Sequence, residues 1–317
     1  MVNAIAWLRL KIDARQKDRQ HKQNLYETIE EIVEIADPKI RLARRYRTSL
    51  LSPVEKAVSH CRMMAGSIPG PVRLHQKTYY DNPLVKALFR TVDEMETLLR
   101  QGRKTAGPGA EKELFALLTM TKEETTIYGH KQQGEMILAD VPMRAVTFID
   151  HRIVAPSPDP QATMAGLVKR SLEILAGVAL EEIGSLRANL AELRERRARL
   201  SSMRSILRGK RPTFEVFAQL QQENAGKLEE LETLLGETEG EIETARKAIE
   251  TPDDALGYLQ RILESPAGTL SLRGQSLKLN WMNVLVEGEE PFHQIDLAEL
   301  ALNEELRRSA LLVSFDR

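Results

Sequence analysis

The chain has little of what several protein classes require, beginning with cysteine. Its 317 residues include one cysteine, Cys61, which excludes an internal disulfide and is usual for a reducing compartment. Aromatic residues make up only 5%, a low share for a β-rich protein and an ordinary one for helical bundles. Neither sign of charge dominates, because 45 basic residues stand against 46 acidic residues. Without a whole-molecule field, any binding to nucleic acid or membrane must come from a local patch.

Long hydrophobic runs are also missing. No stretch approaches the ~20 apolar residues of a transmembrane helix. The apolar start, residues 1–10, lacks the basic region and the cleavage site of a signal peptide. We therefore expect a cytoplasmic protein. Within this start, Ile5, Trp7 and Leu8 form an apolar patch that could dock on a membrane interface or on a protein, and its small size favours the protein.

The sequence lacks the usual motifs of catalytic and cofactor sites. It has no Gly-x-x-x-x-Gly-Lys-Ser/Thr phosphate loop, no Gly-x-Gly-x-x-Gly and no Gly-x-Ser-x-Gly. The histidines fit no zinc pattern, and Cys61 lies among residues typical of a helical core. Asp150 and His151 come closest to an acid–base pair, but neighbours on a strand point to opposite faces. We therefore expect no cofactor and no metal.

Two runs of apolar residues at heptad spacing are the strongest signal that the sequence does contain. They are separated by a helix stop and restart at Gly209-Lys210-Arg211-Pro212. Two helices folded back on each other would share these residues, so we predict an antiparallel coiled-coil arm over residues 161–250. Arg197 and Arg204 fall at core positions, where polar residues trade stability for register or partner choice. The predicted core residues are Ile183, Leu186, Leu190, Leu193, Leu200, Leu207, Leu228, Leu231, Leu235, Ile242 and Ile249.

The two halves of this arm carry opposite charge. Residues 161–211 hold eleven basic and five acidic residues, whereas residues 213–250 hold ten Glu and three basic residues. Pairing of an acidic with a basic helix is the favoured explanation. The alternative is contact with nucleic-acid phosphates or an acidic protein surface, although no aromatic residues interleave for base stacking. The candidate contact residues are Arg194, Arg196, Arg197, Arg199, Arg204, Arg208, Lys210 and Arg211.

For the fold we predict a mainly α protein with a small β component. An N-terminal helical bundle would cover residues 1–122, and a small α+β head would combine residues 123–160 with 251–317. The arm would be inserted in the head. The elements expected outside the arm are helices over 2–36, from Lys39, from Pro53 to about Gly66 and from Pro83, a short helix around Leu114–Leu118, three short strands over 125–154, a hairpin over 269–286 turning at Arg273–Gln275, a last helix opened by Asp296 and Glu299, and a closing strand over 310–315.

Two smaller clusters each allow a structural and a functional interpretation. One is basic, and pairing with acidic residues upstream is favoured over contact with phosphate or acidic lipid. Its members are Lys39, Arg41, Arg44, Arg45 and Arg47, and the acidic residues are Glu30, Glu31 and Glu34. The other is the polar and aromatic loop His75–Asn82, which could hold binding residues, although a structural turn is the commoner explanation.

These observations favour a non-catalytic cytosolic subunit for interaction or assembly. It would dock partner proteins, or copies of itself, through the coiled-coil arm and the helical bundle, in a homo- or hetero-oligomer. A nucleic-acid-binding accessory protein that uses the arginine-rich arm tip is the second hypothesis. The third is an enzyme whose site is assembled from dispersed residues of the head, such as His130, Asp150 and His151.

Overall fold

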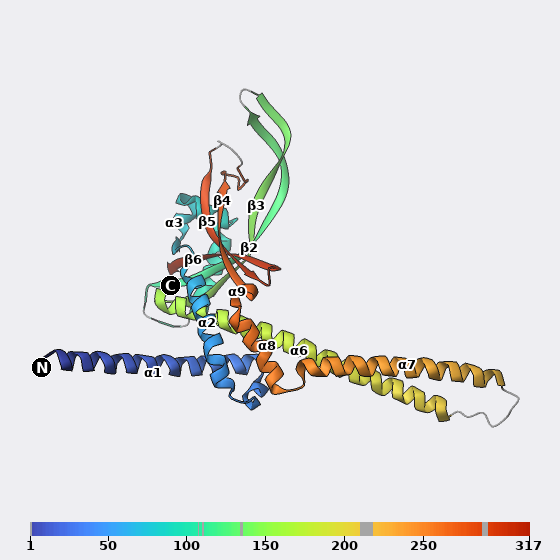
Figure 1. Ribbon diagram of the computed structural model, residues 1–317. Coiled ribbons are helices and arrows are strands. Elements are labelled where there is room, and N and C mark those ends of the chain that lie inside the picture. The colour runs from blue at the N-terminus through green and yellow to red at the C-terminus, as the bar shows by residue number, and fades with distance from the viewer. Residues whose placement is uncertain (1, 107, 110, 134–135, 210–217, 287–290) are drawn as a thin grey trace. The chain divides into compact units, whose positions relative to one another are not determined.

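The protein is a mixed α/β structure, as seen in a computed structural model (Figure 1). Among the described residues, helices hold 60% and strands 27%, so the expectation of a mainly α fold with a small β component is wrong. The described residues are 2–106, 108–109, 111–133, 136–209, 218–286 and 291–317, with the backbone alone for 2–18, 130–133, 136–138, 209 and 218–224. Within these ranges, none of the helices combines the length and the apolarity that crossing a bilayer requires.

The chain divides into two compact units, each built from two stretches of sequence. The first unit is Met1–Val54 with Ala176–Leu263, and the second is Glu55–Leu175 with Glu264–Arg317. The elements in chain order are α1 (Val2–Ala36), the 3-10 helix η1 (Pro38–Leu42), α2 (Tyr46–Gly66), β1 (Val72–Leu74), α3 (Gln76–Asp81), α4 (Pro83–Leu88), α5 (Val92–Ala106), β2 (Glu113–Gln133), β3 (Met136–Ser157), α6 (Pro160–Gly209), α7 (Ala218–Ile249), α8 (Pro252–Glu264), α9 (Pro266–Thr269), β4 (Leu270–Leu279), β5 (His293–Leu302) and β6 (Leu306–Asp316).

The second unit contains a six-stranded sheet, counted over the described residues, with the order β3-β2-β6-β5-β4. Strand β1 pairs with β6 in parallel, and the other pairings are antiparallel. Val284 bridges Ala145 of β3, and its neighbour Leu285 bridges Leu279 of β4. The segment after β4 therefore joins the two ends of the strand order, and the sheet closes on itself at this end.

Both faces of this sheet are covered, which explains why its central strands were hard to predict. One face of β2, with Leu114, Leu118 and Met120 fully buried, packs in the main core beside residues of α4 and α5. The other face places Leu117 in a second core with Leu167 of α6. A strand buried on both faces is a continuous apolar run without alternation. The short helix predicted around Leu114–Leu118 is therefore wrong.

Three further predictions in this unit are corrected. Residues 125–154 form two long strands instead of three short ones, because Tyr128 pairs with Pro142 and the ladder continues past the expected turn. The expected turn at Arg273–Gln275 lies inside β4, where Gly274 pairs with Ala298. The last helix is instead β5, whose Ile295 and Leu297 point into the core. The closing strand over 310–315 is confirmed as part of β6.

In the first unit, α1 confirms the helix predicted over 2–36. The helix predicted from Lys39 is wrong at its start, because residues 38–42 form η1 and α2 begins at Tyr46. Helices α6 and α7 lie alongside each other (Figure 1). Ion pairs join Arg196 to Glu241 and Arg208 to Glu232, so later residues of α6 face earlier residues of α7. The two helices are therefore antiparallel.

Candidate functional site

The predicted core residues of the arm line one side of each helix. In α6, Ile183 and Leu190 are buried, and in α7, Leu235 and Ile249 are buried. The remaining predicted core residues within the described chain are half-buried: Leu186, Leu193, Leu200, Leu207, Leu228, Leu231 and Ile242. Thr238 is also fully buried, and its hydroxyl donates to the carbonyl of Leu234 at 2.7 Å. A supercoiled seam between these helices stays a prediction.

The arginine-rich segment is divided between internal ion pairs and exposed side chains. Arg196 lies 3.6 Å from Glu241, and Arg208 lies 2.6 Å from Glu232. Arg199 pairs with Glu195 on its own helix at 3.7 Å. Arg194 and Arg197 are exposed, Arg204 is half-buried, and Lys210 and Arg211 lie outside the described residues, as do the side chains of Ile5, Trp7 and Leu8.

Two large apolar side chains are exposed near the end of α6. Met203 is 53% exposed and Ile206 is 58% exposed, and the two are three residues apart, on neighbouring turns of one helix face. Arg199 lies four residues before Met203 and is exposed as well. We call Arg199, Met203 and Ile206 the distal face of α6. Sequence analysis missed this face because Met203 and Ile206 fall outside the heptad positions.

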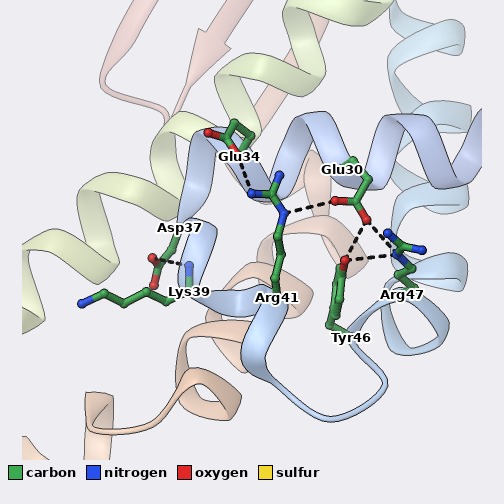
Figure 2. Close-up of polar contacts among 7 residues, drawn as sticks. All are labelled: Glu30, Glu34, Asp37, Lys39, Arg41, Tyr46 and Arg47. Carbon is green, nitrogen blue, oxygen red and sulfur yellow. Dashed lines mark hydrogen bonds and ion pairs between the residues drawn. The ribbon is translucent and has the colours of Figure 1, made fainter.

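Two of the five residues in the basic cluster after α1, Arg41 and Arg47, pair with acidic residues of α1 (Figure 2). The Glu30 carboxylate accepts hydrogen bonds from the Tyr46 hydroxyl at 2.7 Å, from Arg47 Nε at 2.8 Å and from Arg41 Nε at 3.2 Å. Arg41 also pairs with Glu34 at 2.6 Å. Burial raises the pKa of Glu30, but these hydrogen bonds outweigh burial and hold the pKa below its usual value. The favoured interpretation, pairing with upstream acids, is confirmed for Arg41 and Arg47.

Asp37 fixes the end of α1 in the same region (Figure 2). Its Oδ1 caps η1 by accepting from the backbone N–H of Lys39 at 3.0 Å, and its Oδ2 accepts from Arg187 of α6 at 2.5 Å. The Asp37 side chain is 6% exposed, so this ion pair is shielded on the acidic side. These contacts join the end of α1 to α6, so Asp37 has a structural role.

A shallow groove of about 410 Å³ is lined by Tyr26, Glu30 and Arg47, among others.

The groups considered for catalysis are engaged in structure. The His151 ring stacks on Phe89, its Nε2 lies 2.8 Å from the carbonyl oxygen of Leu88, and its Nδ1 lies 3.4 Å from Glu94. Burial lowers the pKa of His151, although Glu94 acts in the opposite direction. The preceding Asp150 is held by Arg308 at 2.7 Å, which lowers the pKa of that carboxyl.

The nucleophile and metal candidates give the same picture. Burial raises the pKa of the Cys61 thiol to about 11, which leaves almost no thiolate at neutral pH. No group of three potential metal ligands occurs among the described residues. The side chain of His130 lies outside them.

The second unit contains one arrangement that the sequence did not predict. A cavity of about 160 Å³ opens between α3, α4 and the start of β5, and we call it the Trp281 cavity. Its floor is apolar, with Leu279 and Ile295 buried in the main core. Its aromatic and polar lining residues are Tyr80, Lys86, Asn280, Trp281, Asn283 and His293. The only sequence signal was the loop His75–Asn82, which folds as α3 and contributes Tyr80.

Comparison with known proteins adds no assignment. No family model, curated protein or solved structure matches the chain.

Proposed function

We propose that the protein is a non-catalytic assembly subunit that docks through the helices α6 and α7. The observation that carries the proposal is the distal face of α6, where Met203 and Ile206 are more than half exposed in the arginine-rich part of the helix. Exposed apolar side chains that lie together beside a cation are typical of protein contact surfaces. The buried histidine and the unreactive thiol support a role without catalysis. The same proposal places the protein in the cytoplasm, supported by its single, buried cysteine.

Partner proteins and further copies of the chain were both expected as occupants, and charge favours a second copy. The outward side of α7 carries Glu229, Glu230 and Glu237, all exposed and without an ion pair to any described residue. A two-fold axis would place α7 of the first copy against α6 of the second copy, and α7 of the second copy against α6 of the first. Such a contact is self-complementary and closes as a dimer. The four helices would then form an antiparallel bundle.

The test compares two double variants by size-exclusion chromatography with light scattering. Met203→Glu with Ile206→Glu places carboxylates on the distal face, and we expect the dimer of the native chain to become a monomer. Ala198→Glu with Ser205→Glu adds the same charge to two exposed positions that lie neither three nor four residues from any member of the distal face, and should leave the dimer intact. A native chain that is monomeric would contradict the proposal, and so would equal effects of the two double variants.

A further inference from the structure

We propose that the Trp281 cavity binds a nucleotide unit, with the base against the aromatic rings and the phosphate toward Lys86. This site lies in the second unit and is independent of the assembly function. The rings supply the first argument. Tyr80 is 70% exposed and Trp281 is 75% exposed, and both line the same cavity from separate elements. Exposed rings are platforms on which bases stack, a contact that tolerates any base.

The size of the cavity determines how much of a ligand it accepts. Sites that enclose a whole small molecule usually occupy about 300–1,000 Å³. At about 160 Å³, the Trp281 cavity has room for one ring system, and the rest of the ligand must stay outside. A nucleotide fits this limit, because its planar base can fill the cavity while its sugar and phosphate stay outside.

The polar lining groups suit the edge of a base. Asn280 Oδ1 accepts from the backbone N–H of Met282 and of Val284, and Asn283 Nδ2 donates to the Ala87 carbonyl. The amide nitrogen of Asn280 and the amide oxygen of Asn283 have no hydrogen bond to a described residue. One donor and one acceptor are thus free at the cavity, as the mixed donor and acceptor edge of a base requires.

The charge of the lining favours a phosphate. Lys86 and His293 line the cavity, whereas no Asp or Glu does so among the described residues. Lys86 is exposed and has no ion pair with any described residue. Lys86 beside the exposed rings of Tyr80 and Trp281 combines a cation with stacking surfaces, the two features by which proteins bind single-stranded nucleic acids.

An extended peptide is disfavoured on the side of residues 280–286, because the backbone there is already paired. Peptides that add to a sheet edge depend on free main-chain groups. Here Val286 N–H donates to Lys278, Asn280 N–H donates to Val284, and Leu285 N–H donates to Arg144. These bonds occupy the backbone N–H groups of 280, 285 and 286, so side chains must recognise a ligand on this side of the cavity.

Fluorescence of Trp281 tests the proposal directly. The chain has two tryptophans, so Trp7→Phe leaves Trp281 as the only reporter. Titration of this variant with a short oligothymidylate should quench the emission to saturation. A free thymidine monophosphate forms the second arm: equal affinity for both probes assigns the site to free nucleotides, and tighter oligonucleotide binding that weakens with salt assigns it to strands.

Matched substitutions make the result specific. Tyr80→Ala should weaken binding about tenfold or more, because stacking on one ring contributes about that much. Tyr128→Ala, which removes a ring that is 72% exposed on the β2–β3 ribbon, should leave affinity unchanged. Lys86→Ala should reduce the salt dependence, whereas Lys77→Ala on α3 should not.

Three results would overturn the proposal. The first is the absence of quenching by both nucleotide probes, and the second is an equal loss of affinity in Tyr80→Ala and Tyr128→Ala. The third is quenching by an acidic aromatic peptide in the absence of any response to nucleotides. Because the side chains of Lys77, Tyr80, Lys86 and Tyr128 are exposed, unchanged circular dichroism of these variants is expected and is checked first.

Discussion

Substitution of Asp37 should loosen the junction between α1 and α6 by a predictable amount. The carboxylate makes two contacts: one oxygen caps η1 through the N–H of Lys39, and the other accepts from Arg187. Asp37→Ala removes both contacts at once. Asp37→Asn keeps an oxygen for the cap, since Asn is as good a capping residue as Asp, but removes the charge.

The expected free energies follow from these contacts. A lost cap costs about 1 kcal/mol, and a hydrogen bond to a charged group contributes about 1.5–3 kcal/mol. The Arg187 side chain is 36% exposed and can return to water, so the loss for the ion pair belongs at the lower end. We therefore expect Asp37→Ala to cost about 3 kcal/mol and Asp37→Asn to cost about 2 kcal/mol.

Native-state hydrogen exchange is the appropriate assay, because a chain of two units need not unfold in one step. The opening free energy of amides in the last turns of α1 and in η1 is compared between variants. Asp253→Ala, an exposed acidic residue in the first turn of α8, is the control and should cost less than about 1 kcal/mol. The reasoning is refuted if Asp37→Ala has no larger effect than this control.

Three further predictions concern the second unit. The Cys61 thiol, with a pKa raised to about 11 by burial, should not react with a disulfide reagent at pH 8 until the chain is unfolded. Because burial lowers the pKa of His151 from 6.5, its contribution to stability is complete above that value and is lost as the pH falls through the lowered pKa. Urea unfolding of His151→Phe should therefore depend less on pH between 7 and 5 than that of the native chain. Gly70 has φ +118°, and a Cβ there would collide with the Leu312 carbonyl, so Gly70→Ala should cost about 2 kcal/mol or more in the same assay.

The long helices could be predicted because their signals are local. Stop signals and an apolar period mark α1 and α6 along the chain itself. Strands β2 and β5 could not be identified in this way, because long-range packing gives their residues a conformation that the local pattern does not show. Leu114–Leu118 has apolar residues at helical spacing, and only the helices that cover both faces of the sheet explain its strand conformation.

The candidate sites could likewise be predicted only where their signal is local in the sequence. The charge split between α6 and α7 indicated the ion pairs that join the two helices. The Trp281 cavity combines Tyr80 with residues about two hundred positions later, and no local pattern connects them. The distal face was missed for another reason, because an exposed Met203 lies outside the seam on which the heptad pattern depends.

The central claim is assembly through the distal face of α6. Each of Met203 and Ile206 would gain about 1 kcal/mol on burial of its exposed half, which over two copies amounts to about 4 kcal/mol. Light scattering after size exclusion, repeated over a dilution series, measures this association. We predict a dimer for the native chain that dissociates at much higher concentration in Met203→Glu with Ile206→Glu. A native chain that remains monomeric throughout the series would contradict the account.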